Sequence, residues 1–146
     1  MDCREILYGS REYEETVALR DVVLRRPLGL VFSSETLKAE SSDFHLACYG
    51  DEGELLACLI LTPEDTENIR MRQVAVREDL QGGGIGTTLV QFSEEFAKAR
   101  RFSCMTMHAR ESAVPFYERL NYERYGERFE EVTIPHWKMR KKLVAL

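Results

Sequence analysis

The sequence predicts an α+β domain that contains one parallel crossover between strands. Turn-bounded apolar runs fill the first half of the chain, and a strand, a glycine-rich loop and an amphipathic helix follow one another over residues 69–100. The 146 residues are 44% hydrophobic and 31% charged, which suits one packed core and excludes a disordered or low-complexity chain. We therefore expect a single domain over residues 1–146.

The first half of the chain predicts two helices and three strands. Tyr13, Val17 and Leu24 share one helical stripe, which indicates a helix over residues 12–25. Gly50 and Gly53 bracket a turn between two strand-like runs, a pattern typical of a β-hairpin. The other elements expected here are a strand over 4–8, a short helix over 34–38, and the two hairpin strands over 44–49 and 55–61.

The second half predicts the parallel crossover. A strand over 69–76 leads through a loop into a helix in which Leu89, Phe92 and Phe96 recur at helical spacing. Ser112 can cap a further helix over 113–120. The remaining elements expected here are a strand over 104–107 and a terminal extended segment over 133–143.

Charge and cysteine usage narrow the possible partners and surroundings. Twenty Lys and Arg against twenty-five Asp and Glu give a formal charge of −5, which argues against a nucleic-acid-binding protein. No apolar run approaches membrane-spanning length, and the N-terminal segment does not resemble a secretory signal, so we expect a cytoplasmic protein without membrane contact. The cysteines form no C-x-x-C pair, and all four are expected to be reduced and structural: Cys3, Cys48, Cys58 and Cys104.

The glycine-rich stretch Gln81-Gly82-Gly83-Gly84-Ile85-Gly86 is the most informative motif. Small residues before a helix let successive backbone N–H groups face an anion, so the loop predicts phosphate binding rather than a merely flexible turn. The third glycine of a dinucleotide-binding loop is absent, and no lysine follows Gly86 as a triphosphate-binding loop would need. The pattern therefore disfavours NAD and ATP as ligands.

QGGGIG, followed by AVPFYERLNY, resembles two motifs of the GCN5-related N-acetyltransferases (GNAT) in their usual order. The resemblance implies the GNAT fold, a mixed sheet of six to seven strands with about four helices and a central parallel strand pair splayed to admit acetyl-CoA. It implies that the loop amides hold the acetyl-CoA pyrophosphate and that the preceding strand meets the pantetheine arm. The residues so implied are Val74, Ala75, Val76, Gln81, Gly82, Gly83, Gly84, Ile85, Gly86 and Thr87. The chain departs from the pattern at Gly82 and Gly83, where side chains are commoner, and at Asn121, where glycine is usual.

LRDVVLRRP, FHLACY, HARESAVPFYERLNY and IPHWKM resemble the branch that contains glyphosate N-acetyltransferase and related small-amine acetyltransferases. This resemblance implies that Arg20, Arg72 and Arg110 clamp an acidic substrate. It also implies His136 as general base and Tyr117 as general acid.

Residue chemistry suits these roles but leaves alternatives open. A histidine can accept an amine proton near neutral pH and a phenol can protonate a leaving thiolate, while the backbone N–H near Val74 can stabilise the oxyanion. His136 could instead be a partly buried ring bonded to a carbonyl, Tyr117 a core aromatic, and each arginine half of an internal salt bridge. The rival bases are Glu64, Glu67 and Glu131.

The expected activity is acetyl-CoA-dependent N-acetylation of a small-molecule amine that carries a phosphate, phosphonate or carboxylate, by direct transfer in a ternary complex. No cysteine is placed to act as a covalent carrier, and no metal is expected. Two alternatives remain: a peptide or protein N-acetyltransferase, and a CoA-binding module without turnover. The sequence leaves a homodimer open.

Overall fold

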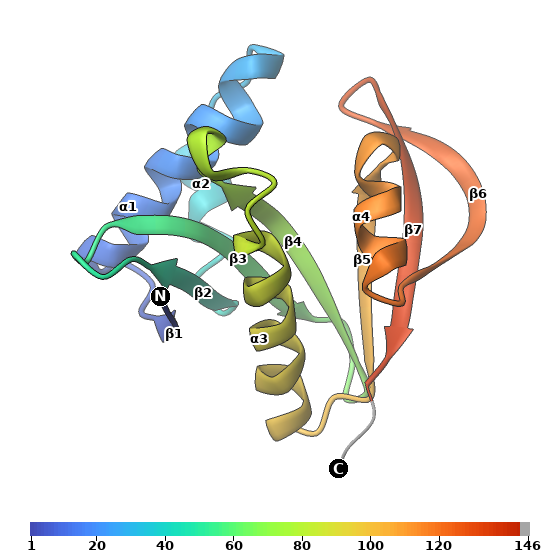
Figure 1. The fold of residues 1–146 in the computed structure, drawn as a ribbon. Coiled ribbons are helices and arrows are strands. Elements are labelled where there is room, and N and C mark those ends of the chain that lie inside the picture. Colours follow the sequence, from blue (N-terminus) through green and yellow to red (C-terminus); the bar gives the residue numbers. More distant parts are fainter. Residues whose placement is uncertain (144–146) are drawn as a thin grey trace. The chain divides into compact units, whose positions relative to one another are not determined.

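The computed structural model describes residues 1–143, and over these it contains seven strands and four α-helices (Figure 1). The regular elements are β1 (Asp2–Ile6), α1 (Arg11–Arg20), α2 (Ser34–Lys38), β2 (Phe44–Tyr49), β3 (Leu55–Pro63), β4 (Asn68–Val76), α3 (Ile85–Ala99), β5 (Cys104–Arg110), α4 (Val114–Arg119), β6 (Glu123–Glu131) and β7 (Ile134–Lys142). Short turns complete them: the π-helical η1 (Asp21–Arg25) and the 3₁₀ turns η2 (Arg26–Leu28), η3 (Glu78–Leu80) and η4 (Glu111–Ala113). No helix in this part of the chain is long and apolar enough to cross a membrane.

The strands form one mixed sheet in the order β1-β2-β3-β4-β5-β7-β6. β4 and β5 run parallel, from Asn68 opposite Cys104 to Met71 opposite Met107, and α3 lies between them in the chain. The pairs β1–β2, β2–β3, β5–β7 and β6–β7 are antiparallel. The predicted α+β class with one parallel crossover is confirmed.

The chain divides into two compact units, which we describe separately. The first unit comprises residues 1–62 and 73–93. β2 and β3 are buried along almost their whole length, because the central strands of a sheet covered on both faces carry continuous apolar runs. Its core includes Ile6, Tyr13, Ala47, Tyr49, Cys58 and Ala75, against which half-buried residues of α1 pack.

The second unit comprises residues 63–72 and the chain from 94 onward. β5 alternates strictly: Met105, Met107 and Ala109 are buried, while Cys104, Thr106, His108 and Arg110 are partly exposed. This period of two gives β5 one apolar and one polar face. The polar face carries the ionisable side chains described below.

Several boundaries differ from the sequence-based prediction for local reasons. Ser10 accepts a hydrogen bond from the Tyr13 N–H (3.1 Å) and starts α1, so the first strand ends earlier, at Ile6. The expected cap Ser112 lies inside η4, and α4 starts without a side-chain cap. β6 was not predicted, because its exposed, charged sequence and the register shift between Tyr125 and Phe129 hide the alternation of a strand. Asn121 adopts a φ of 71°, the left-handed conformation that asparagine tolerates.

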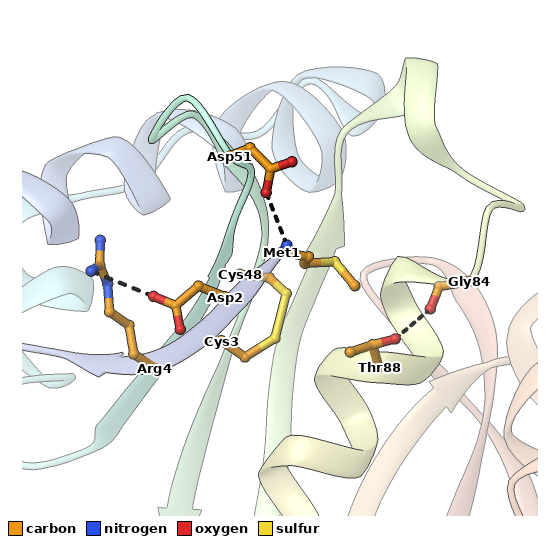
Figure 2. Close-up of a disulfide and its surroundings, with 8 residues drawn as sticks. All are labelled: Met1, Asp2, Cys3, Arg4, Cys48, Asp51, Gly84 and Thr88. Carbon is orange, nitrogen blue, oxygen red and sulfur yellow. Dashed lines mark hydrogen bonds and ion pairs between the residues drawn. A yellow bond between two sulfur atoms is a disulfide. The ribbon is translucent and has the colours of Figure 1, made fainter.

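The expectation that all four cysteines are reduced is wrong for Cys3 and Cys48, which form a disulfide (Figure 2). The antiparallel register sets Cys3 of β1 directly opposite Cys48 of β2, so the two side chains leave the same face of the sheet. Cys58 and Cys104 are free thiols. The link joins the edge strand β1 covalently to its neighbour.

Candidate active site

The glycine-rich loop turns the chain from the end of β4 into α3. Gly82 and Gly84 have φ angles of 85° and 90°, in the left-handed region where a Cβ is strained. A Cβ would meet nothing within 4 Å at either position, so the backbone angle and not a lack of space calls for glycine. The loop conformation therefore depends on these two residues.

Side-chain and backbone hydrogen bonds hold the loop at both ends. The Gln81 amide donates to the Val76 carbonyl at the end of β4 (3.1 Å). Thr88 donates to the Gly84 carbonyl through its backbone N–H (3.0 Å) and its hydroxyl (3.1 Å), as Figure 2 shows for the hydroxyl. The first amides of a helix have no carbonyl partner within it, and the first turn of α3 carries no acidic residue. This helix start can therefore accept an anion.

The end of β4 precedes the loop within the same unit. Ala75 is buried in the core of the first unit, while Val74 and Val76 are half-buried. Gln73 interrupts the strand with a φ of 55°, and its buried side-chain Oε1 has no hydrogen-bond partner among the described residues. The residues expected to bind the cofactor thus form one continuous stretch of the first unit, from Val74 to Thr87.

Arg20 lies in the first unit with its guanidinium buried. Its two terminal nitrogens donate to the two carboxylate oxygens of Glu40 at 2.9 and 2.8 Å, and only 1% of the side chain is exposed. This geometry is the internal salt bridge that the sequence left open. Because the pair uses both terminal nitrogens, we carry only Arg72 and Arg110 forward as candidate anion-binding residues.

Arg72 and Arg110 belong to the second unit, where both are half-buried. Arg110 at the end of β5 stands directly opposite His136 of β7, so the two side chains leave the same face of the sheet. Arg70 lies two residues before Arg72 in the same unit. Burial lowers the pKa of Arg70, and the positive charge of Arg72 lowers it further. Arg70 and Arg72 are thus close enough for their charges to repel.

His136 is buried, with 4% of the residue exposed. Its Nδ1 donates to the Ile134 carbonyl (2.7 Å), because a carbonyl oxygen can only accept. This leaves Nε2 as the nitrogen that can receive a proton, and Nε2 lies 3.6 Å from Oε2 of Glu131. The ring is therefore bonded to a carbonyl, which is the structural role that the sequence left open. Its other nitrogen also faces a carboxylate with which it can exchange a proton.

His108 and Arg70 join His136 and Glu131 in one cluster that the sequence did not identify. Nη2 of Arg70 lies 2.9 Å from Nδ1 of His108, and Oε1 of Glu131 lies 3.2 Å from the same nitrogen. His108 shares the polar face of β5 with Arg110, two residues further on. That alternation was visible in the sequence, but the strand β6 that brings Glu131 to it was not.

The other two rival bases, Glu64 and Glu67, also lie in the second unit and take part in hydrogen bonds there. Glu64 accepts a hydrogen bond from the Thr106 hydroxyl. The backbone carbonyl of Glu67 accepts from the Ser103 N–H at 2.8 Å. Of the three, only Glu131 lies against an imidazole ring within the described residues.

Tyr117 lies in α4 and is 7% exposed. Its ring stands edge-on to Phe116 and Tyr122, with centroids 4.9 and 5.8 Å away. Burial raises the pKa of Tyr117, which keeps the phenol protonated at neutral pH. A protonated phenol is the form that a general acid requires.

Comparison with known proteins identifies the family. The model of the acetyltransferase (GNAT) domain matches residues 29–143. A UPF0039 protein of Schizosaccharomyces pombe is 30% identical, in a match that covers 95% of this chain and 97% of that protein. Among solved structures, a protein of Lactobacillus plantarum assigned as an N-acetyltransferase superposes with a TM-score of 0.86 at 25% identity, covering 99% of this chain and all of the other.

A second solved structure shows the same fold with a ligand. An aminoglycoside 6'-N-acetyltransferase in complex with coenzyme A has a TM-score of 0.83 at 16% identity, covering 100% of this chain and 99% of that one. The family match spans more than half of the chain, and the seven-stranded mixed sheet with its parallel β4–β5 pair agrees with it. The chain belongs to the GNAT family of acetyltransferases.

Proposed function

We propose that this enzyme transfers the acetyl group of acetyl-CoA to the amine of a small substrate that also carries a phosphate, phosphonate or carboxylate. Acetyl-CoA is the cosubstrate, no metal is required, and transfer is direct within a ternary complex. The family model runs through both compact units, from residue 29 to residue 143, which supports a single N-acetyltransferase domain.

The observation that carries the proposal is the pair of left-handed glycines before α3. Gly82 and Gly84 turn the loop so that it enters the N-terminus of α3, whose free amides suit a pyrophosphate. The fold neighbour with bound coenzyme A supports the same ligand for this chain. The half-buried Val74 and Val76 are the residues we propose for the pantetheine arm.

Acetyl transfer forms a C–N bond at the thioester carbonyl and breaks the C–S bond. The substrate ammonium must lose two protons, one before it attacks and one as the tetrahedral intermediate collapses, and the leaving thiolate must gain one. In this proposal the second unit accepts the amine proton through His136, and the buried phenol of Tyr117 donates to the thiolate. One proton is released overall.

The acidic substrate is proposed from the arginines. Guanidinium groups bind phosphate, phosphonate and carboxylate oxygens bidentately, and Arg110 leaves the sheet from the same face as His136. The resemblance to the glyphosate N-acetyltransferase branch points to the same substrate class. A peptide acceptor would favour acidic rather than cationic walls, so we rank it second.

A panel of paired amines tests the proposal. Acetyl-CoA consumption is followed with an aminoalkylphosphonate, an amino acid and the matching amines without the acidic group, alongside a lysine peptide. We expect turnover of the acidic amines, and Arg110→Ala should raise KM for these at least tenfold more than for the neutral ones. Arg119→Ala, an exposed residue of α4, is the matched control.

Three outcomes would count against the proposal. Turnover of the peptide alone would replace the small-molecule acceptor. If Arg110→Ala raises KM equally for acidic and neutral amines, Arg110 does not bind the acidic group of the substrate. If coenzyme A does not bind in a calorimetric titration, the glycine-rich loop is not a coenzyme site and the proposed activity is wrong.

A further inference from the structure

The carboxylate of Glu131 lies between two imidazole rings of the second unit. Its Oε1 is 3.2 Å from Nδ1 of His108, and its Oε2 is 3.6 Å from Nε2 of His136. The three side chains come from β6, β5 and β7, and β7 lies between the other two strands in the sheet. One carboxylate can therefore exchange protons with either ring.

The Phe129 ring lies close to both histidine rings. Phe129 precedes Glu131 by two residues on β6, and its centroid lies 5.1 Å from the His108 ring and 5.7 Å from the His136 ring. Phe129 thus gives both imidazoles an apolar neighbour, while the Glu131 side chain stays 44% exposed.

Exposure and hydrogen bonding distinguish the roles of Glu131 and His136. The His136 side chain is 5% exposed, its Nδ1 is used by the Ile134 carbonyl, and its Nε2 faces Glu131. The Glu131 side chain is 44% exposed. An incoming amine therefore reaches the carboxylate more readily than the ring behind it.

His108 has two partners of opposite charge in the same cluster. Its Nδ1 is close to Nη2 of Arg70 (2.9 Å), which can only donate, and to Oε1 of Glu131, which accepts when ionised. A neutral ring with a lone pair on Nδ1 can accept from Arg70. A ring that carries its hydrogen on Nδ1 can donate to Glu131 instead, so the tautomer of His108 decides which of the two partners it binds.

We infer that Glu131 is the group that takes the proton from the substrate ammonium and passes it to Nε2 of His136. An N–H bond of the ammonium breaks and an O–H bond forms on Glu131. That proton then moves to Nε2, which restores the carboxylate beside an imidazolium. Glu131 is the catalytic residue in this scheme, and His136 stores the proton until products leave. The inference rests on the proposed N-acetyltransferase activity.

The test removes the proton-accepting oxygen while keeping the shape of the side chain. Glu131→Gln should lower kcat/KM for the acidic amine by about 10²-fold or more at pH 7, the usual contribution of a general base. The melting temperature and the coenzyme A affinity of this variant should remain close to those of the wild type. Glu130→Gln makes the same charge change at the adjacent exposed position of β6 and should leave kcat/KM within twofold.

Chemical rescue separates proton transfer from a structural role. Glu131→Ala should regain at least tenfold of its lost kcat/KM in 100 mM formate, because the added carboxylate can accept the proton. Glu131→Asp should retain activity with an altered pH profile. If formate restores nothing while the variant still binds coenzyme A, the direct proton-accepting role is overturned.

The outcomes also separate this inference from the proposed function. Wild-type turnover together with an unimpaired Glu131→Gln variant overturns the inference alone and leaves His136 as the direct base. A wild-type enzyme that binds coenzyme A but acetylates no amine in the panel overturns both.

Discussion

Arg20 and Glu40 form a bidentate ion pair across twenty positions of sequence, with both side chains almost completely buried. The Tyr13 hydroxyl donates to the same carboxylate (2.9 Å), and the Phe32 ring lies 4.6 Å from the Arg20 guanidinium carbon. The pair thus joins α1 to the segment that follows α2.

Removing one partner of this pair should destabilise the protein strongly. Glu40→Ala leaves the Arg20 charge buried without compensation, which typically costs about 3–5 kcal/mol. Urea denaturation should show a lower midpoint, whereas Glu35→Ala, at an exposed position in the first turn of α2, should change it little. An unchanged midpoint in Glu40→Ala would show that the ion pair does not form in solution.

Gly84→Ala should weaken coenzyme A binding at least tenfold. Alanine at a φ of 90° is strained by about 1–2 kcal/mol, so the loop should turn away from its present conformation. Gly29→Ala is the matched control, because Gly29 has a φ of 68° and equally open surroundings but lies outside the loop. Calorimetric titration of both variants should separate the two effects, and equal affinities would rule out the loop as the coenzyme site.

Cysteine labelling should distinguish the bonded from the free thiols. Burial raises the pKa of Cys58 to about 12, so this thiol should resist iodoacetamide at pH 8 in the folded protein. The native chain should then take up at most one label, on Cys104, and reduction should add Cys3 and Cys48. Intact mass and peptide mapping would measure this, and prompt labelling of Cys3 before reduction would argue against the disulfide.

The disulfide should also contribute to stability. A link across 45 positions of sequence restricts the unfolded chain, and the chain-entropy estimate for such a loop is about 4 kcal/mol. Cys3→Ser should lower the urea midpoint of the oxidised protein and make it insensitive to reductant, while Cys104→Ser should keep the reductant sensitivity. A wild-type midpoint that does not respond to reductant would contradict this prediction.

Stability should decline as the pH rises above about 10, the ordinary pKa of tyrosine. Burial raises the pKa values of Tyr13, Tyr117 and Tyr122. Glu40 raises the pKa of Tyr13 further, and Glu94 does the same for Tyr122. The unfolded chain therefore loses these protons first, which favours unfolding at alkaline pH. Tyr117→Phe should show a shallower decline of the urea midpoint from pH 9 to 11 than Tyr8→Phe, an exposed control. Identical slopes would contradict the raised pKa.

Local patterns predicted much of the fold. The hairpin strands, the strand before the glycine loop, the helix after it and the short helix around Val114 depend on periodicity and turn residues close in sequence. β6 was missed because it is an exposed edge strand with a register shift and Gly126 at a φ of 72°. Its burial pattern resembles that of a charged loop.

The sequence could point only to those parts of the candidate site that one segment of the chain forms. The loop from Gln81 to Thr87 is such a segment. The partners of Arg20 and Cys3 come from distant positions, Glu40 and Cys48, and depend on tertiary contacts that spacing does not reveal. The cluster around Glu131 likewise needs three strands in register before its members meet.

The hydrogen bond from Gln81 to the Val76 carbonyl bears on how the loop would meet a ligand. A loop that is hydrogen-bonded to the end of a strand is already ordered in the folded protein. Binding a ligand there therefore does not cost the conformational entropy of ordering the loop. Coenzyme recognition at this turn should then resemble docking onto a preformed surface, with the loop backbone in one geometry before and after the encounter.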